Sequence, residues 1–320
     1  MGKKRDLRLD VLRGLLMMLV VMGHCIQYVA APTDFDHNII FRLIYSFHMP
    51  AFMCLSGYVT HLVHPHCTCK QLGKRISSLL VPFLVWGIFS TMKDGIPYWS
   101  IFLYPEKGLW FLWVLAEINV LVFLIEKIPA TLKYAGYVCV YILLLMIPWN
   151  TFGVGQVRMY FLWFALGVVG PVFWKPFPHK AAIRAAGLIG WPVAALFWMR
   201  NEDPLFANMF HLVGMEARAF HYFCSVYRLY LTPLLGIVFI WTVSRAVWKY
   251  LPVKLLQTVG ENTIAIYAMQ YYCWIRAFPI PFVNVVASFI LAILLPVLFV
   301  RVISKWRLLA FLFLGKKPNC

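Results

Sequence analysis

Long apolar runs separated by short polar segments form the main pattern of this chain. Ten such runs can be placed, and most are long enough to be full membrane helices. A helix needs about 20 apolar residues to cross roughly 30 Å of hydrocarbon. The pattern therefore predicts an all-α, polytopic membrane protein with about ten transmembrane helices, at residues 11–31, 39–60, 76–92, 108–126, 134–149, 158–174, 182–199, 229–247, 261–277 and 280–301.

Composition supports a membrane protein and argues against the soluble classes. Of the 320 residues, 62% are hydrophobic and only 13% are charged. The formal net charge of +17 suggests nucleic-acid binding at first sight. The basic residues are spread through short loops between apolar runs, however, which is typical of topology signals, and no nucleic-acid partner is expected. The eight cysteines do not have the pattern of a secreted disulfide framework.

The distribution of Lys and Arg predicts the orientation of the chain. With ten spans, 20 of the 29 basic residues fall on the side of the N-terminus, 8 fall on the opposite side, and Arg13 lies within the first span. This bias places the N- and C-termini in the cytoplasm. We expect one membrane domain over residues 1–320, with an outer loop at about 200–228. The aromatic residues of that loop could anchor an interfacial helix or cover a bound sugar.

The first span carries ionisable groups where a bilayer disfavours them. Asp10 and Arg13 lie at its start, and His24 lies well inside it. A charge at the helix centre costs at least ~2.5–3.5 kcal/mol, and such groups tend to mark function. At ~100° per residue, His24 returns to within about 20° of Arg13, roughly 16 Å further along. One helix face thus offers a cation and a distant imidazole, which suits a long anionic ligand with a reactive end.

Two more ionisable residues are expected near the depth of His24. His48 in the second span and Glu117 in the fourth both fall about 10–14 Å below the outer surface by helical rise. Pro50 cannot donate to the carbonyl of Ser46, which leaves an acceptor beside His48. Glu117 could orient a histidine and raise its basicity. The structural alternatives are a buried, satisfied His24, an Arg13 that snorkels to the surface, and a Glu117 paired with Arg158.

Several motifs resemble the membrane acyltransferase-3 family, in particular its fucose 4-O-acetylase-like branch. The resemblance covers nearly the whole chain. It rests on Asp10-Val11-Leu12-Arg13-Gly14 followed by His24, Phe47-His48-Met49-Pro50, Leu55-Ser56-Gly57-Tyr58, Lys74-Arg75 before Leu80-Val81-Pro82-Phe83, Leu109-Trp110-Phe111-Leu112, Phe164-Ala165-Leu166-Gly167 and Gly260-Glu261-Asn262-Thr263-Ile264-Ala265-Ile266-Tyr267. One departure is Gln270, because members often have a histidine shortly after the Ile-Tyr pair.

The resemblance implies transfer of an acyl group, most often acetyl, from cytoplasmic acyl-CoA to a hydroxyl of an extracytoplasmic glycan or glycolipid. The expected location is the bacterial cytoplasmic membrane, and no metal is expected. His24 would act as general base or as a transient acyl carrier. The other expected site residues are Glu117 and His48 in catalysis, Arg13, Asp10, Lys74 and Arg75 at the donor, and Trp110, Trp113, Arg158 and Ser46 at the acceptor.

Two alternatives from other functional classes stay open at this point. A transporter or flippase of a lipid-linked saccharide would also bury ionisable groups near the membrane centre. A metal site could form in the loop that carries His61, His64, His66, Cys67 and Cys69, since these ligand types suit zinc. The spacing of that loop matches no standard zinc motif.

Overall fold

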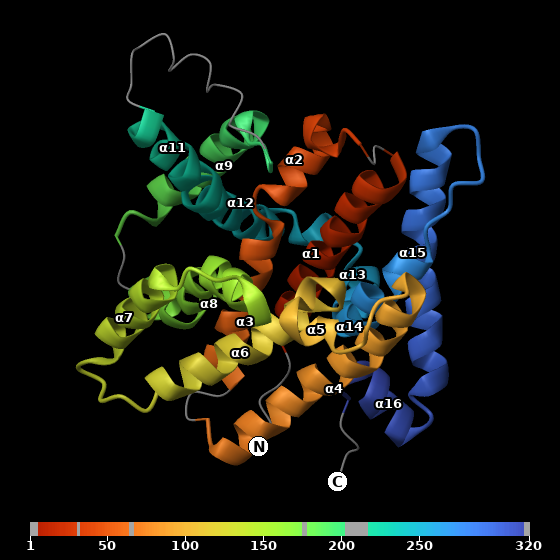
Figure 1. Cartoon of the computed structure of the whole chain (residues 1–320). Coiled ribbons are helices and arrows are strands. Elements are labelled where there is room, and N and C mark those ends of the chain that lie inside the picture. The colour runs from red at the N-terminus through yellow and green to blue at the C-terminus, as the bar shows by residue number, and fades with distance from the viewer. Residues whose placement is uncertain (1–5, 31–32, 64–66, 175–177, 202–216, 317–320) are drawn as a thin grey trace.

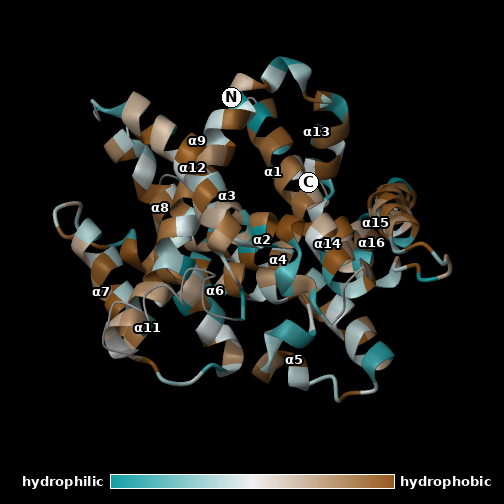
Figure 2. Cartoon of the chain, turned by 90° about the horizontal axis from the view of Figure 1, so that it is seen from above, coloured by the Kyte–Doolittle hydropathy of each residue, from teal (hydrophilic) through white to brown (hydrophobic). Residues whose placement is uncertain are grey.

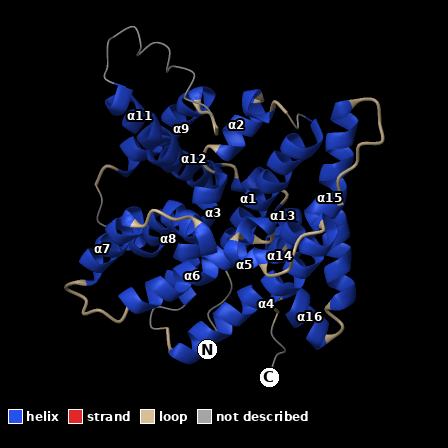
Figure 3. Cartoon of the chain, in the orientation of Figure 1, coloured by secondary structure: helices blue, strands red, loops and turns tan. Residues whose placement is uncertain are grey.

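Helices make up most of the protein. The computed structural model describes residues 6–30, 33–63, 67–174, 178–201 and 217–316. No strand occurs in these ranges, and short loops connect the helices (Figure 3). The all-α prediction is confirmed for this part of the chain.

The elements follow one another as a series of long helices with short helical turns between them (Figure 1). In chain order they are α1 (Leu7–Cys25), η1 (Ile26–Ala30), η2 (Phe35–His37), α2 (Ile39–Tyr45), α3 (His48–Val63), α4 (Cys69–Asp94), α5 (Ser100–Leu103), η3 (Pro105–Lys107), α6 (Trp110–Ile125), α7 (Lys133–Met146), η4 (Thr151–Gly153), α8 (Val154–Trp174), α9 (Lys180–Phe197), α11 (Ala217–Val226), η5 (Tyr227–Leu231), α12 (Thr232–Ala246), η6 (Trp248–Tyr250), α13 (Val253–Glu261), α14 (Thr263–Met269), η7 (Gln270–Tyr272), α15 (Pro281–Ile303) and α16 (Arg307–Leu314).

Within the described ranges, seven helices are long and apolar enough to cross a membrane. They are Leu7–Ala30, Ile39–Leu62, Cys69–Asp94, Thr151–Trp174, Lys180–Phe197, Ala219–Ala246 and Pro281–Ile303. Two shorter apolar helices, α6 and α7, occupy the predicted fourth and fifth spans. The protein is therefore an integral, multi-pass membrane protein. The count of ten spans and the cytoplasmic termini stay predictions.

The outer surface of the helix bundle is apolar, as a lipid-facing surface must be. Along α15 the side chains of Ile290, Leu294 and Leu298 are all exposed and lie on one stripe. Figure 2 shows hydrophobic colouring on α15 and on several other helices at the edge of the molecule. In a soluble protein such surface would aggregate, whereas here lipid chains can cover it.

The predicted ninth span is a broken helix that begins earlier than the hydropathy pattern suggested. Helix α13 starts at Val253 and ends at Glu261, Asn262 interrupts it, and α14 with η7 continues to Tyr272. Leu256 and Val259 are buried, and α13 packs along the first half of α1. Because α13 buries only one face, its polar residues lowered the hydropathy signal there.

Four glycines of the recognised motifs allow helix backbones to touch. A methyl group on Gly14 would lie 1.9 Å from the carbonyl oxygen of Leu256, and one on Gly260 would lie 1.9 Å from that of Asp10. Between α3 and α8, Gly57 and Gly167 make the same kind of contact. Small residues of this kind favour close helix packing in membranes. They fix α1 against α13 and α3 against α8.

Candidate active site

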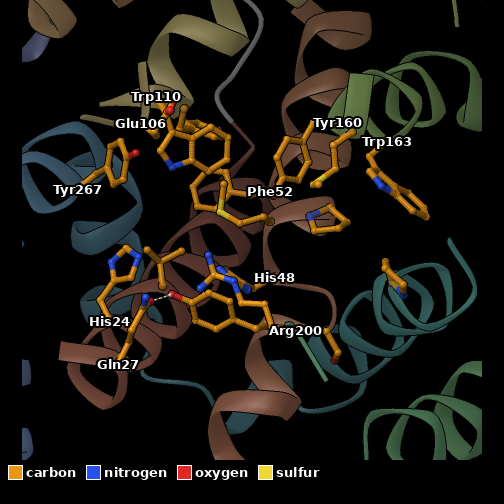
Figure 4. Close-up of a pocket in the computed structure, with 18 of the residues that line it drawn as sticks. His24, Gln27, His48, Phe52, Glu106, Trp110, Tyr160, Trp163, Arg200 and Tyr267 are labelled. Carbon is orange, nitrogen blue, oxygen red and sulfur yellow. Dashed lines mark hydrogen bonds between the residues drawn. The ribbon is translucent and has the colours of Figure 1, made fainter. Parts of the chain in front are cut away.

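A cavity of about 490 Å³ opens between α1, α3, α6, α8, α12 and α14. Its size lies in the range of small-molecule sites, and both polar and aromatic groups line it. The sequence-predicted residues His24, Ser46, His48 and Trp110 all line this cavity, although they come from three separate helices (Figure 4). The further polar lining includes Gln27, Tyr28, Tyr45, Tyr160, Arg200 and Tyr271.

His24 is held in one tautomer by Gln270. The Gln270 amide nitrogen donates to the backbone carbonyl of Tyr267 at 3.0 Å, so its Oε1 is left to accept a hydrogen bond. That oxygen lies 3.0 Å from Nδ1 of His24, which must therefore carry the proton in the neutral ring. Nε2 is then the nitrogen with a free lone pair. Gln270 is fully buried at 0% exposure, whereas His24 is only half-buried and lines the cavity.

The helix that carries His24 widens directly after it. Residues Ile26–Ala30 form a π-helical turn at the end of the first span. Single π-turns of this kind often occur at functional sites, because they rotate the following side chains relative to a regular helix. Gln27 and Tyr28 within this turn both line the cavity. The Gln27 side chain accepts a hydrogen bond from the Tyr45 hydroxyl at 2.9 Å (Figure 4).

His48 lies at a break in the second span. Helix α2 ends at Tyr45, α3 begins at His48, and Pro50 follows in its first turn. The imidazole Nδ1 lies 2.9 Å from the carbonyl oxygen of Ile44, so Nδ1 donates and Nε2 is again the free nitrogen. His48 is buried at 2% exposure. The acceptor beside His48 is thus the Ile44 carbonyl, and not the Ser46 carbonyl that was expected from Pro50.

Arg200 brings a positive charge into the same cavity. Its guanidinium carbon lies 5.0 Å from the centre of the Tyr45 ring. The backbone around it is anchored, since the amides of Arg200 and Asn201 donate to the buried Asp36 carboxylate at 2.9 and 2.8 Å. Within the described residues of the cavity wall, the other cation is Arg228. The lining thus combines two imidazoles with the Arg200 guanidinium, whose backbone is anchored.

The cavity extends along α1 toward the predicted donor residues. Met17, Val20 and His24 line it and share one helix face, and Arg13 lies one turn before Met17 on the same face. Nη1 of Arg13 lies 3.5 Å from Oδ1 of Asp10, which supports the expected pairing of these two residues. Arg13 and His24 therefore share the helix face whose later residues, Met17, Val20 and His24, line the cavity, while Arg13 itself lies outside the cavity wall.

Arg75 lies on α4. Its guanidinium donates to the Thr60 hydroxyl at 2.6 Å and lies within electrostatic range of Arg13. Lys74, by contrast, is exposed at the surface of α4.

The four predicted donor residues are not part of the cavity wall, and three of the residues predicted for catalysis or the acceptor, Glu117, Trp113 and Arg158, also lie outside it. Glu117 does not contact a histidine; its carboxylate lies beside Trp113 and Gly153, two turns beyond the part of α6 that reaches the cavity. The Trp113 indole donates to the carbonyl of Phe152 at 3.0 Å. Arg158 donates to Ile147 and to Asn150. Helical rise predicts the depth of a residue such as Glu117, but it does not specify which way the side chain faces.

Sequence reasoning missed two central residues, Gln270 and Arg200. Gln270 stood out only as a departure from the usual histidine, and the structure places it against His24. Arg200 was one of several outer basic residues at the end of a span. Its one local signal was the cluster of aromatic residues that follows it in the chain. The buried Asp36 that anchors the Arg200 backbone could not be paired with it from sequence.

The metal alternative and the outer loop fall partly outside the described residues. His64 and His66 are among the residues that the structure does not describe, as are Glu202, Asp203, His211 and Glu216 of the predicted loop. In the described part of the chain, no three His, Cys, Asp or Glu side chains gather as metal ligands would. The last part of that loop is helical, since α11 spans Ala217–Val226.

Replacing Gln270 with methionine is expected to lower kcat of the reaction at this site by about 10–100-fold, because the His24 ring loses the acceptor that fixes its tautomer. Gln270→Glu keeps an acceptor at the same place and should retain most of the activity. The comparison is made by steady-state kinetics on both purified variants, with KM for the donor as a second readout that should stay unchanged. Equal kcat values for the two variants would contradict the positioning role.

Comparison with known proteins identifies an acyltransferase family. A sequence model described as an acyltransferase domain, that of the acyltransferase-3 family, matches residues 6–301. "Nodulation protein NolL" of Sinorhizobium fredii is 38% identical over 96 residues, which cover 29% of this chain and 26% of that protein. "Nodulation protein NolL" of Mesorhizobium japonicum is 36% identical over 109 residues, or 33% of this chain and 28% of that protein. The aligned part is thus about a quarter of the length of these curated relatives.

No solved structure matches. Because the family match covers nearly the whole chain, this protein belongs to the membrane acyltransferase-3 family.

Proposed function

We propose that this protein transfers an acyl group, most simply acetyl, from acyl-CoA to a hydroxyl of an extracytoplasmic glycan or glycolipid. The observation that supports the proposal is the cavity lined by His24, whose ring is held by Gln270, together with Arg13 on the same face of α1 below that cavity. Family membership supports an acyl donor and an acceptor in general. The bacterial cytoplasmic membrane is the proposed location, with CoA approaching from the cytoplasm.

The donor would lie along the first span. Arg13 and Arg75 would hold CoA phosphates by charge-assisted hydrogen bonds, and Asp10 would orient Arg13. From Arg13 to His24 the helix rises roughly 16 Å. Apolar lining by Met17 and Val20 suits the slender arm that carries the thioester. The acyl carbonyl would then reach the cavity between His24 and Arg200.

The proposed chemical step uses His24 and Arg200, which both line the cavity. Nε2 of His24 removes the proton of the acceptor hydroxyl, and that oxygen attacks the thioester carbonyl carbon. The charge that develops on the carbonyl oxygen is stabilised by the Arg200 guanidinium. The C–S bond then breaks, an ester remains on the glycan, and the leaving thiolate takes the proton from His24. His48 and Ser46, which line the same cavity, would hold the acceptor.

Purified protein in liposomes, given radiolabelled acetyl-CoA, tests this function against the transporter alternative. Methyl glycosides such as methyl α-L-fucoside and matching oligosaccharides serve as acceptors. The proposal expects label on the saccharide in a form that mild alkali releases, as an O-ester would be. Passage of unmodified saccharide across the bilayer without label transfer would support a transporter and contradict the proposed reaction.

Arg13→Ala should raise KM for acetyl-CoA by about 10-fold or more, since a charge-assisted contact to phosphate contributes roughly 1.5–3 kcal/mol. Arg8→Ala is the matched control, because Arg8 lies on the same helix but contacts the Trp248 ring instead. Five residues at ~100° each place it about 140° from Arg13. Initial rates at varied acetyl-CoA give both KM values, and equal values would contradict donor binding on the Arg13 face.

A further inference from the structure

Tyr267 carries a hydroxyl group that has no hydrogen-bond partner within the described part of the protein. The residue lies on α14, is only 6% exposed, and lines the same cavity as His24. Buried polar groups nearly always have a partner, and one that is left without a partner lowers the stability of the folded protein. Phenylalanine would fill the same space without this cost, so the hydroxyl is better explained by a ligand than by packing.

The Tyr267 side chain reaches from α14 toward the start of α6. Its ring packs edge-on against the Phe111 ring, with centroids 6.2 Å apart, and Figure 4 shows its hydroxyl pointing into the cavity on the side of Trp110. Phe111 is the second residue of α6, so its amide has no acceptor within its own helix, and no described side chain caps this helix start. The Phe111 amide also acts on the Tyr267 oxygen, but an N–H can only donate. The O–H proton of Tyr267 is therefore left without an acceptor.

The two groups that lie side by side here are both hydrogen-bond donors. A hydroxyl beside the N-terminus of a helix favours an oxygen atom that carries partial negative charge. A full anion is disfavoured, because Glu106 lines the same cavity and precedes the same helix start. A carbonyl oxygen suits the pair best, since it accepts from both donors and needs no acceptor of its own.

Tyr267 has a fixed position relative to His24. The Gln270 amide nitrogen donates to the Tyr267 carbonyl at 3.0 Å, and the Gln270 oxygen holds the His24 ring. Helices α13 and α14 follow α1 in the same direction, because Gly260 lies against Gly14 and Gln270 lies against His24. Tyr267 precedes Gln270 by three residues, so it lies roughly 4–5 Å nearer to the proposed donor end of α1.

The arm of acyl-CoA has a carbonyl group in the matching place. Two methylene groups join its thioester sulfur to a secondary amide, which is the first polar group on the way to the phosphates. With the thioester at His24 and the arm beside Val20 and Met17, this amide would lie on the donor side of His24, as Tyr267 does. The cavity thus offers a donor pair at the level where the donor substrate has a carbonyl oxygen.

We infer that the Tyr267 hydroxyl, together with the Phe111 amide, binds the carbonyl oxygen of this first amide, so that the protein selects acyl donors that carry it. The inference deepens the proposed function and rests on it. Binding would give the buried hydroxyl the partner that it lacks in the free protein. Tyr267 is then a donor-binding residue that the sequence motif alone did not assign.

The test compares two small acyl donors, S-acetyl-N-acetylcysteamine and S-pentyl thioacetate, with methyl α-L-fucoside as acceptor. The first donor keeps the thioester and the amide, whereas the second has methylene groups in place of the amide in a chain of equal length. For the wild type, kcat/KM should be about tenfold higher with the first donor, because a buried hydrogen-bonding site rejects a ligand that lacks the acceptor. Tyr267→Phe should lose this preference. An equal preference in the wild type and in Tyr267→Phe would overturn the inference.

Tyr141→Phe is the matched control. Tyr141 lies on α7, outside the cavity wall, and its hydroxyl shares a 2.8 Å hydrogen bond with the Tyr230 hydroxyl. Loss of this partnered hydroxyl should lower the melting temperature of the ligand-free protein and leave the donor preference unchanged. Tyr267→Phe should leave the melting temperature unchanged or raise it, because it removes an unpartnered group. A larger fall in Tyr267→Phe than in Tyr141→Phe would indicate a structural role and contradict the inference.

Calorimetric binding of acetyl-CoA without acceptor separates this inference from the proposed reaction. Binding by the wild type that is weakened about tenfold by Tyr267→Phe, but not by Tyr141→Phe, supports the donor site even if no acyl group is transferred, in which case the transfer proposal alone fails. Label transfer with the same Kd for acetyl-CoA in the wild type and in Tyr267→Phe would overturn the inference and leave the reaction intact. A defect of Tyr267→Phe that occurs only with acceptors bearing an acetamido group would assign the hydroxyl to the acceptor and overturn it as well.

Discussion

His24→Ala is expected to reduce acyl transfer by ~10²–10⁴-fold, which is the usual contribution of a positioned general base. The expected loss follows from the hydrogen bond that Gln270 makes with the His24 ring. Gln270 fixes the proton on Nδ1, so Nε2 is the basic atom of the His24 ring, and unlike the buried His48 the half-buried His24 is partly accessible in the cavity. The measurement is label transfer from acetyl-CoA to methyl α-L-fucoside, with expression matched between variants.

His61→Ala is the control for this experiment. His61 lies on α3, near the end of the helix opposite His48, and is not part of the cavity wall. Its replacement should leave the rate unchanged. A His24→Ala protein that is folded, still binds acetyl-CoA and transfers acetyl at the wild-type rate would remove His24 from the mechanism. Acyl label trapped on His24 in the absence of acceptor would favour the carrier role over the general-base role.

Arg200→Met should lower kcat by about 10²–10³-fold with a smaller change in KM, as expected for loss of a group that stabilises developing oxyanion charge. The substitution is structurally mild, because the backbone amides of Arg200 and Asn201, not the side chain, are anchored to Asp36. Kinetics at saturating donor and varied acceptor separate the two constants.

Arg158→Met provides the matched comparison for Arg200. Arg158 was expected at the acceptor from sequence, but its guanidinium hydrogen-bonds to Ile147 and Asn150 away from the cavity. Its loss should affect thermal stability more than kcat. A larger drop in kcat for Arg158→Met than for Arg200→Met would contradict the assignment of the electrostatic role to Arg200.

The spans of this fold could be predicted well because lipid imposes a strong and simple pattern. Nine of the ten predicted segments correspond to apolar helices. The remaining segment, the ninth in chain order at 261–277, was placed too late. Its first helix, α13, buries an apolar face against α1 and carries polar residues on its other faces. The motif glycines were visible in the sequence, but their pairing was not, because which helices touch depends on the whole bundle.

The site could be predicted only in part, because the sequence shows which residues share a helix face but not which helices meet. Arg13 and His24 share one helix, so their common face follows from helical periodicity alone. His48 followed from a short hairpin to the neighbouring span. Glu117 came from a more distant helix whose rotation the sequence does not fix, and it points elsewhere. Gln270, which contacts His24, and Arg200, which lines the cavity, come from later parts of the chain, where no local pattern indicates the partner.

The bond between His24 and Gln270 joins residues 246 positions apart and has a consequence for biosynthesis. The first span enters the membrane early in translation, whereas the segment that carries Gln270 emerges only when most of the chain has been made. The His24 ring therefore lacks this partner in the nascent chain, and its tautomer becomes fixed only when the late helices pack against the first span.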